Sequence, residues 1–447
     1  MSHLFAWLLN ALYLSAILLA LPWLFWSAWR HGKYREGFAA KLWGQVPLRL
    51  GDRPCVWLHA VSVGEVNLLS TLLDEFRQCR PDWETAISTT TKTGYELALK
   101  KYPDQRVFYC PLDFSWATRR AMRRLRPDLL VLAELELWPN LIQSARSHGA
   151  RVAIVNGRLS DNSVRGYQRI RPFVARVLQQ ITFITAQNQE SADRFCQLGA
   201  NPESVHAVGS LKFDGAQINR DNEQTRHLRT LAGLHANDMV LLAGSTQDPE
   251  ESYSIRIFQK LHPLYPRLKL ILVPRHPQRF EEVASLLKQS GLSWIRRSAL
   301  EAKNSSSQKT HAVILVDTIG ELGAWWGTAT IGFVGGSFGS RGGQNMLEPA
   351  AYGVATCFGP NTWNFRDMVS QLLKAGGAQV VNDQIEFEQF VRHAIEDPQW
   401  AEGLGQKARD LVLTQQGATQ RTVKMLLPRI EAERKTSPSC QLRKGAA

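Results

Sequence analysis

The sequence is poor in cysteine and lacks the short motifs that usually hold nucleotides or metals. Its 447 residues include six cysteines, and no two of them form a Cys-x-x-Cys pair. This argues against a disulfide scaffold and against a zinc ribbon. Neither Gly-x-Gly-x-x-Gly nor Gly-x-x-x-x-Gly-Lys-[Ser/Thr] occurs, so the usual dinucleotide and P-loop sites lack their fingerprint. No Asp-x-Asp pair is present either, so a metal-bound diphosphate is not implied.

Acidic residues are outnumbered by basic ones. The chain has 53 Lys and Arg against 40 Asp and Glu, which gives a formal net charge of +13. Such an excess favours a polyanionic partner, and nucleic acid, an anionic bilayer and a phosphorylated substrate all remain open at this point. Hydrophobic residues make up 44% of the chain, which excludes a disordered protein.

The first thirty residues contain the longest stretch without charge. Residues 4–29 are almost wholly apolar, which is long enough for a helix to cross a bilayer. Four basic residues follow and place the rest of the chain in the cytoplasm by the positive-inside rule: Arg30, Lys33, Arg35 and Lys41. A cleaved signal peptide would need a basic segment before the run and a small-residue cleavage site after it, and neither occurs. We therefore expect residues 1–30 to be an uncleaved membrane anchor.

Beyond residue 50, short apolar runs alternate with longer amphipathic ones. The apolar runs predict strands at 56–61, 85–88, 106–109, 128–133, 151–155, 182–185, 239–243, 268–273, 312–316 and 330–334. This alternation predicts an α/β protein with two Rossmann-like domains, whose parallel sheets face each other across a cleft. The expected domain boundaries are 31–215, a linker at 216–237, 238–430, and a disordered tail at 431–447.

Polar residues follow many of these strands, and ligands bind beyond the carboxyl ends of strands in such sheets. Glu65 lies at a strand-to-helix turn, where it can take a proton from an acceptor hydroxyl or simply favour the helix dipole. Glu134 and Glu136 would share one face if the preceding strand continued that far. Lys212 precedes the expected linker and can reach an acidic ligand or remain solvated.

The second half of the chain contains a glycine-rich stretch at residues 335–343. Its backbone N–H groups can approach a phosphate, and the segment that follows can begin a helix with positive potential at its start. Glu348 in that first turn can accept hydrogen bonds from ribose hydroxyls. Arg275, at the end of another strand, can pair with an anion in the same cleft. A flexible loop before an acidic helical turn is the alternative.

Five arginines at helical spacing predict a basic face: Arg119, Arg120, Arg123, Arg124 and Arg126. Near a membrane anchor, such a face suits anionic headgroups or a phosphorylated lipid, although it can also be merely solvated. No nucleic-acid-binding motif accompanies it, so nucleic acid is not an expected partner.

Eight motifs in order resemble the Kdo transferases, the 3-deoxy-D-manno-octulosonic acid transferases of lipopolysaccharide synthesis. They lie at residues 57–65, 89–94, 134–140, 186–188, 209–214, 272–277, 335–348 and 359–365. The resemblance implies a GT-B glycosyltransferase with an N-terminal acceptor domain and a C-terminal domain that binds CMP-Kdo. It also implies inverting, single-displacement transfer of Kdo to a lipid A precursor of the lipid IVA type, at the cytoplasmic face of the inner membrane. Neither a metal nor another cofactor is implied.

The resemblance assigns roles to individual residues. Glu65 matches the general base, and Arg275 matches the arginine near the donor phosphate. Four residues match the nucleotide-binding stretch: Gly336, Ser337, Asn345 and Glu348. Glu136 and Lys212 match residues that line the cleft.

Three positions depart from the family pattern. The family usually has His where Gln247 and Gln344 stand, and Pro where Met346 stands. Glutamine keeps hydrogen bonding but cannot be protonated, so an acid role at position 344 is in doubt. Other readings remain: a GT-B glycosyltransferase with a UDP-sugar donor, a sugar epimerase of that fold, or a non-catalytic membrane-tethered binding protein.

Overall fold

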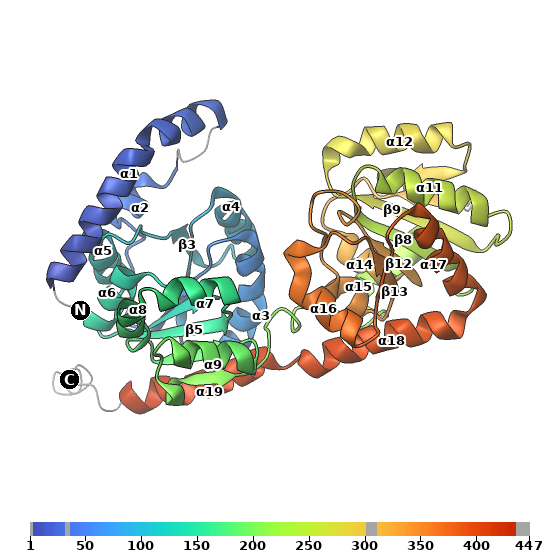
Figure 1. The fold of residues 1–447 in the computed structure, drawn as a ribbon. Coiled ribbons are helices and arrows are strands. Elements are labelled where there is room, and N and C mark those ends of the chain that lie inside the picture. The colour runs from blue at the N-terminus through green and yellow to red at the C-terminus, as the bar shows by residue number, and fades with distance from the viewer. Residues whose placement is uncertain (1–2, 32–35, 301–310, 435–447) are drawn as a thin grey trace. The chain divides into compact units, whose positions relative to one another are not determined.

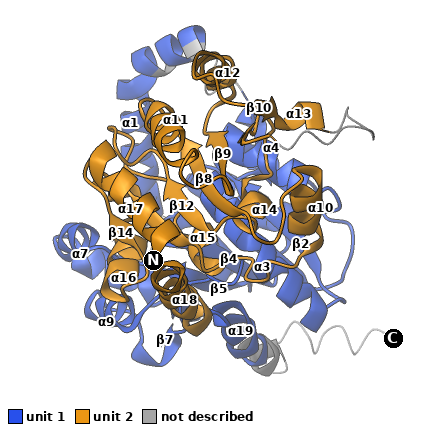
Figure 2. Cartoon of the chain, turned by 90° about the vertical axis from the view of Figure 1, so that its right-hand side faces the viewer, with its two compact units in different colours: residues 1–215, 416–447 blue, residues 216–415 orange. Residues whose placement is uncertain are grey.

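Two parallel β-sheets form the centres of two units in this computed structural model (Figure 1). The structure describes residues 3–31, 36–300 and 311–434. The first unit comprises residues 1–215 together with 416–447, and the second comprises residues 216–415 (Figure 2). The expected α/β class with two Rossmann-like parallel sheets is confirmed.

The sheet of the first unit has the strand order β3-β2-β1-β4-β5-β6-β7. Its strands are β1 (Cys55–His59), β2 (Glu84–Thr89), β3 (Arg106–Tyr109), β4 (Leu129–Ala133), β5 (Arg151–Gly157), β6 (Phe183–Ala186) and β7 (Val205–Ala207). Every residue of β1, β4 and β5 is buried, as expected when helices cover both faces of a parallel sheet. In β4, Leu130 joins one apolar cluster and Val131 the other, because successive side chains point to opposite faces.

The first unit contains helices from both ends of the chain. They are α1 (His3–His31), α2 (Phe38–Trp43), α3 (Val63–Cys79), α4 (Lys92–Lys101), α5 (Ser115–Leu125), α6 (Pro139–Ser147), α7 (Asp161–Gln168), α8 (Arg171–Leu178), α9 (Gln189–Gln197) and α19 (Ala418–Arg434). Residues of α5, α6 and α8 pack on one face. On the other face, Val423 and Leu426 of α19 join Leu72 of α3 in one cluster.

The second unit repeats this architecture with the strand order β10-β11-β9-β8-β12-β13-β14. Its strands are β8 (Met239–Thr246), β9 (Leu268–Pro274), β10 (Trp294–Arg296), β11 (Val313–Leu315), β12 (Ile331–Val334), β13 (Ala355–Phe358) and β14 (Gln379–Val380). Its helices are α10 (Glu223–Leu231), α11 (Glu250–Leu261), α12 (Phe280–Gln289), α13 (Arg297–Leu300), α14 (Leu322–Trp326), α15 (Leu347–Ala351), α16 (Arg366–Lys374), α17 (Gln384–Glu396) and α18 (Pro398–Gln415). Strands β7, β10, β13 and β14 were not predicted from the sequence.

The domain boundaries differ from those expected. Residues 216–237 are not a separate linker, because Arg220 donates hydrogen bonds to the carbonyls of Tyr352 (2.7 Å) and Ala329 (2.8 Å) within the second unit. Residues 416–430 belong to the first unit rather than the second, because Gly417 N donates to Asp214 Oδ1 at 2.6 Å. Of the expected tail, residues 431–434 continue α19, and residues 435–447 lie outside the described residues.

Helix α1 is long and apolar enough to cross a membrane. Its window Ala6–Trp23 has a mean hydropathy of 1.6, and 11% of that window is buried. Large apolar side chains along the helix are exposed: Trp7, Leu8, Leu12, Leu18, Leu19, Trp23, Phe25, Trp26 and Trp29. The first half of α1 also contacts the first unit, since Asn10 Nδ2 donates to Ser115 Oγ (2.8 Å) and Tyr13 donates to Asp113 (3.2 Å).

The basic face expected on α5 is smaller than the sequence predicts. Arg124 Nε donates to the carbonyl of Val46 at 2.6 Å, and Arg126 Nη2 donates to the carbonyl of Arg49 at 3.0 Å. These two guanidinium groups therefore hold the segment before β1, because its carbonyls need donors. Arg119 and Arg123 remain exposed on the helix.

Candidate active site

Polar residues from several strands gather at the carboxyl edge of the first sheet. Glu65 follows β1, Glu134 and Glu136 follow β4, and Asn156 lies near the end of β5. Because β1 pairs with β4 and β4 pairs with β5 in parallel, the carboxyl ends of these strands are neighbours. The strand-end rule thus brings together residues that are far apart in the sequence.

Glu65 occupies the first turn of α3, and its carboxylate has two partners. Val61 N donates to Oε2 at 2.7 Å, and Ser62 Oγ donates to Oε1 at 2.8 Å. Burial raises the pKa of Glu65, and the negative charge of Glu134 raises it further, while the hydrogen bonds act in the opposite direction. The carboxylate is therefore a stronger base than an exposed glutamate, as proton abstraction near neutral pH requires.

Glu134 and Glu136 reach the site in a way that the sequence did not predict. The strand ends at Ala133, and Glu134 has a φ of +57°. The two side chains were expected to share a face only if the strand continued to them, and that condition is not met. Burial nevertheless raises the pKa of Glu136 to about 7, and Glu65 and Glu134 raise it by charge repulsion, so the three carboxylates interact.

Each of the two later glutamates has a specific partner. Lys212 Nζ lies 2.9 Å from Glu134 Oε1, and Trp138 Nε1 donates to Glu136 Oε2 at 2.8 Å. The structure thus brings Glu65, Glu136 and Lys212 into one constellation through Glu134. Their contact with an acceptor stays a prediction.

Asn156 fixes the segment that carries Lys212, a role that sequence reasoning missed. Its Oδ1 accepts hydrogen bonds from Ser210 Oγ (3.2 Å) and Leu211 N (3.0 Å). Its φ of +57° is rare for residues other than glycine, although asparagine tolerates it. An Asn-Gly pair at the end of a buried strand was the available signal.

The second unit has its own polar edge, at the ends of β9 and β12. Arg275 is exposed directly after β9. Glu348 lies near enough that the positive charge of Arg275 opposes the rise in its pKa that burial causes. Asn345 Nδ2 donates to Glu348 Oε1 at 3.0 Å. These three predicted donor-binding residues therefore lie together.

The glycine-rich loop differs from the expectation. Backbone N–H groups of this loop were expected to approach a phosphate, but those of Gly336, Ser337 and Phe338 donate to the buried carboxylate of Glu250. Ser337 is itself fully buried, and its Oγ accepts a hydrogen bond from Gly359 N at 2.8 Å. Gly336 and Ser337 therefore shape the loop from inside, and their amides are already occupied in this structure.

The two glutamines that depart from the family pattern meet at Gly336. A Cβ atom added to Gly336 would lie 3.2 Å from Gln344 Nε2 and 3.3 Å from Gln247 Nε2. The third departure, Met346, is fully buried, and its methyl carbon would lie 3.0 Å from a Cβ at Gly343. Two carboxamides from different elements thus stand where the sequence resemblance expects two imidazoles.

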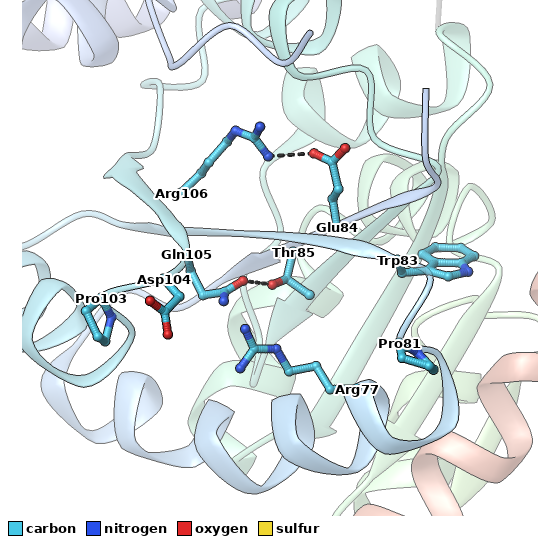
Figure 3. A pocket seen from close by; sticks show the side chains of 9 residues that line it. All are labelled: Arg77, Pro81, Trp83, Glu84, Thr85, Pro103, Asp104, Gln105 and Arg106. Atoms are coloured by element: carbon cyan, nitrogen blue, oxygen red, sulfur yellow. Dashed lines mark hydrogen bonds and ion pairs between the residues drawn. The ribbon is translucent and has the colours of Figure 1, made fainter. Parts of the chain in front are cut away.

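A pocket of about 590 Å³ lies away from both polar edges. Glu84 and Arg106, which begin β2 and β3, lie on its wall (Figure 3). Arg106 Nη1 lies 2.5 Å from Glu84 Oε2. This is the amino edge of the first sheet, at the opposite end of the strands from Glu65. In the described parts of the chain, no group of three His, Cys, Asp or Glu side chains has an arrangement that could hold a metal ion.

Comparison with known proteins identifies the family. The model of 3-deoxy-D-manno-octulosonic-acid transferases (kdotransferases) matches residues 32–215. The 3-deoxy-D-manno-octulosonic acid transferase of Haemophilus influenzae is 34% identical over 379 residues, which is 84% of this chain and 87% of that protein. The chain belongs to the Kdo transferase family. The enzyme of the same name from Bordetella pertussis is 33% identical over 418 residues, or 90% of this chain and 94% of that protein.

The fold of this Kdo transferase family member is of the GT-B type. The crystal structure of UDP-GlcNAc 2-epimerase from Neisseria meningitidis, bound to UDP-GlcNAc, superposes with a TM-score of 0.56. It covers 84% of this chain and 100% of that chain at 13% identity, so the similarity concerns the fold alone. Family membership makes the chain a glycosyltransferase, and its structure has two Rossmann-like units and an N-terminal apolar helix.

Proposed function

We propose that this protein transfers Kdo from CMP-Kdo to a lipid A precursor of the lipid IVA type, with inversion and in a single displacement. The observation that carries the proposal is the Glu65 carboxylate, which lies at the end of β1 among two further glutamates and has a raised pKa. Membership of the Kdo transferase family supports the sugar and the donor.

The proposed reaction joins an acceptor hydroxyl to the anomeric carbon of Kdo. The hydroxyl oxygen attacks that carbon from the face opposite the leaving group, which accounts for inversion. The bond from the anomeric carbon to the phosphate oxygen breaks, and its electron pair leaves with CMP. Glu65 accepts the hydroxyl proton during attack. Lys212 and Glu136 orient the acceptor beside it.

Residues of the second unit bind the donor in this proposal. Arg275 pairs with the phosphate and stabilises the negative charge that develops on CMP. Glu348 accepts hydrogen bonds from the ribose hydroxyls, and Asn345 orients its carboxylate through the 3.0 Å contact. Gly336 and Ser337 keep the surrounding loop in shape. We propose no metal ion, so transfer persists when EDTA is added.

We also propose that α1 holds the chain at the cytoplasmic face of the inner membrane as a single-pass anchor. The exposed apolar side chains of α1 support this arrangement, since water is a poor solvent for so many of them together. Exposed arginines on α5 would favour an anionic lipid surface.

Mass spectrometry of the products tests the proposal. Purified full-length protein is mixed with a tetra-acylated lipid A precursor and with CMP-Kdo or a UDP-sugar in parallel. The proposal expects the mass increase of one or more Kdo units with CMP-Kdo alone. Transfer from a UDP-sugar, or no product with CMP-Kdo, would contradict it.

A further inference from the structure

Two adjacent carboxylates at the start of α11 have no role in the chemistry described so far. Glu250 is 1% exposed and Glu251 is 0% exposed. Buried carboxylates are costly unless they are paired or fully hydrogen-bonded. Their partners therefore indicate what this pair, called here the Glu250–Glu251 pair, contributes.

Glu250 is saturated by backbone N–H groups. Its Oε2 accepts from Gln247 N (2.9 Å) and Gly336 N (2.8 Å), and its Oε1 accepts from Ser337 N (2.8 Å) and Phe338 N (3.1 Å). Three of the four donors come from the glycine-rich loop, 86 to 88 residues further along the chain. Both carboxylate oxygens are needed, since each accepts two hydrogen bonds.

The loop is built to admit this carboxylate. A Cβ atom on Gly335 would lie 2.7 Å from Glu250 Oε2 and 2.6 Å from the carbonyl oxygen of Ser245, so no larger residue fits there. Gly336 has a φ of +67°, a conformation that glycine adopts without strain. Gly335 and Gly336 thus allow the loop backbone to lie against the carboxylate of Glu250 rather than against a free phosphate.

Glu251 binds a second loop. Arg279 Nε lies 3.0 Å from Glu251 Oε1, and Arg279 Nη2 lies 3.2 Å from Oε2, so the pairing is two-pronged. Arg279 ends the short segment that follows β9 and Arg275. In the same region, Arg275 N donates to the carbonyl of Thr246 at 3.0 Å, just before the turn that leads to the carboxylates.

We propose that the Glu250–Glu251 pair positions the donor site, with Glu250 holding the glycine-rich loop and Glu251 holding the loop that carries Arg275. This inference rests on the proposed function of the second unit as the CMP-Kdo site. The two carboxylates are positioning residues: they touch neither donor nor acceptor. The start of α11 thereby sets the spacing between two loops that follow different strands, β12 and β9.

The Glu250→Gln substitution tests this role. It keeps the shape of the side chain but replaces one oxygen with an NH2 group, which then faces two N–H donors. We expect the Kd for CMP, measured by calorimetry on the full chain, to rise at least about tenfold, or about 1.4 kcal/mol. The KM for CMP-Kdo should rise in parallel, while the KM for the lipid acceptor stays within twofold of wild type.

Glu281→Gln is the matched control, since Glu281 lies in the first turn of the neighbouring helix α12 but is 79% exposed and pairs with Arg296. It should leave CMP binding unchanged. A folded Glu250→Gln variant with wild-type affinity for CMP, or with donor and acceptor KM raised alike, would overturn the inference. If Glu250→Gln does not fold, Glu251→Gln is compared in the same way, with the same expected direction. Failure of the wild-type protein to bind CMP would instead overturn the proposed donor, and this role with it.

Discussion

Replacing Glu65 with glutamine separates proton transfer from folding. The carboxylate accepts one hydrogen bond from Val61 N and one from Ser62 Oγ. The glutamine carbonyl can still accept from Val61 N, and its NH2 group can donate to Ser62 Oγ, so the loss of stability is about 1 kcal/mol. Loss of a general base lowers kcat by about 10² to 10⁴-fold. We therefore expect a folded protein with little transfer.

The assay follows the Kdo-modified product by mass spectrometry under single-turnover conditions. Ser62→Ala is the matched control, because it removes one hydrogen bond to the carboxylate and leaves the carboxylate in place. We expect its rate to stay within about tenfold of wild type. If Glu65→Gln retained more than a tenth of the wild-type rate, or if Ser62→Ala lost as much, Glu65 would not be the base.

The pH dependence of the rate provides an independent readout. Only ionised Glu65 accepts a proton, so the rate falls as the pH drops through its pKa, which burial and then Glu134 raise. Glu134→Gln removes that negative charge and frees Lys212, and both changes lower the pKa of Glu65. The acid limb of the profile should therefore move to lower pH. A limb that stayed in place or moved upward would contradict this electrostatic account.

Other changes test single features of the molecule. Lys212→Met should raise the acceptor KM about fivefold without altering the circular dichroism spectrum, since an exposed charge contributes about 1 kcal/mol. Burial raises the pKa of Glu136 from 4.5 to about 7, so the folded protein binds an extra proton between these pH values. Stability therefore falls as the pH rises from 4.5 to about 7. Glu136→Gln should flatten this part of the curve of Tm against pH. Replacing both Gln247 and Gln344 with His should make the donor KM fall more steeply at low pH than in the wild-type protein, because imidazoles gain a positive charge in this range and amides do not. Deleting residues 1–31 should move the protein from the membrane pellet to the supernatant on centrifugation.

Strand ends were predictable because burial in a parallel sheet leaves a clear pattern. The runs that became β1 and β4 are buried throughout and apolar except for His59, so the first carboxylates after them mark the carboxyl edge of the sheet. That pattern was sufficient to predict Glu65 and Glu136 as candidates. It could not predict the turn at Glu134, because a positive φ in a non-glycine residue depends on surrounding contacts rather than on local preference.

Long-range partners were the part that the sequence could not supply. The sequence of a glycine-rich loop does not reveal whether its N–H groups bind a phosphate or a carboxylate. The carboxylate of Glu250 lies more than eighty residues away in the chain. Likewise, the sequence placed residues 416–430 in the second domain, because nothing local in that segment says which sheet it covers. The packing of Leu426 with the cluster around α3, together with the hydrogen bond from Gly417 N to Asp214, assigns α19 to the first unit.

Because the first unit is discontinuous in sequence, the two units complete their folding in a fixed order during synthesis. Every residue of the second unit precedes position 416, so that unit can fold as soon as its own chain has emerged from the ribosome. The first unit begins earlier but lacks Val423 and Leu426 from its core until the last helix is made. During this interval the apolar surface of α3 that α19 covers is open to water. A nascent chain therefore finishes its second half before its first, and premature termination near position 415 damages the half that was translated first.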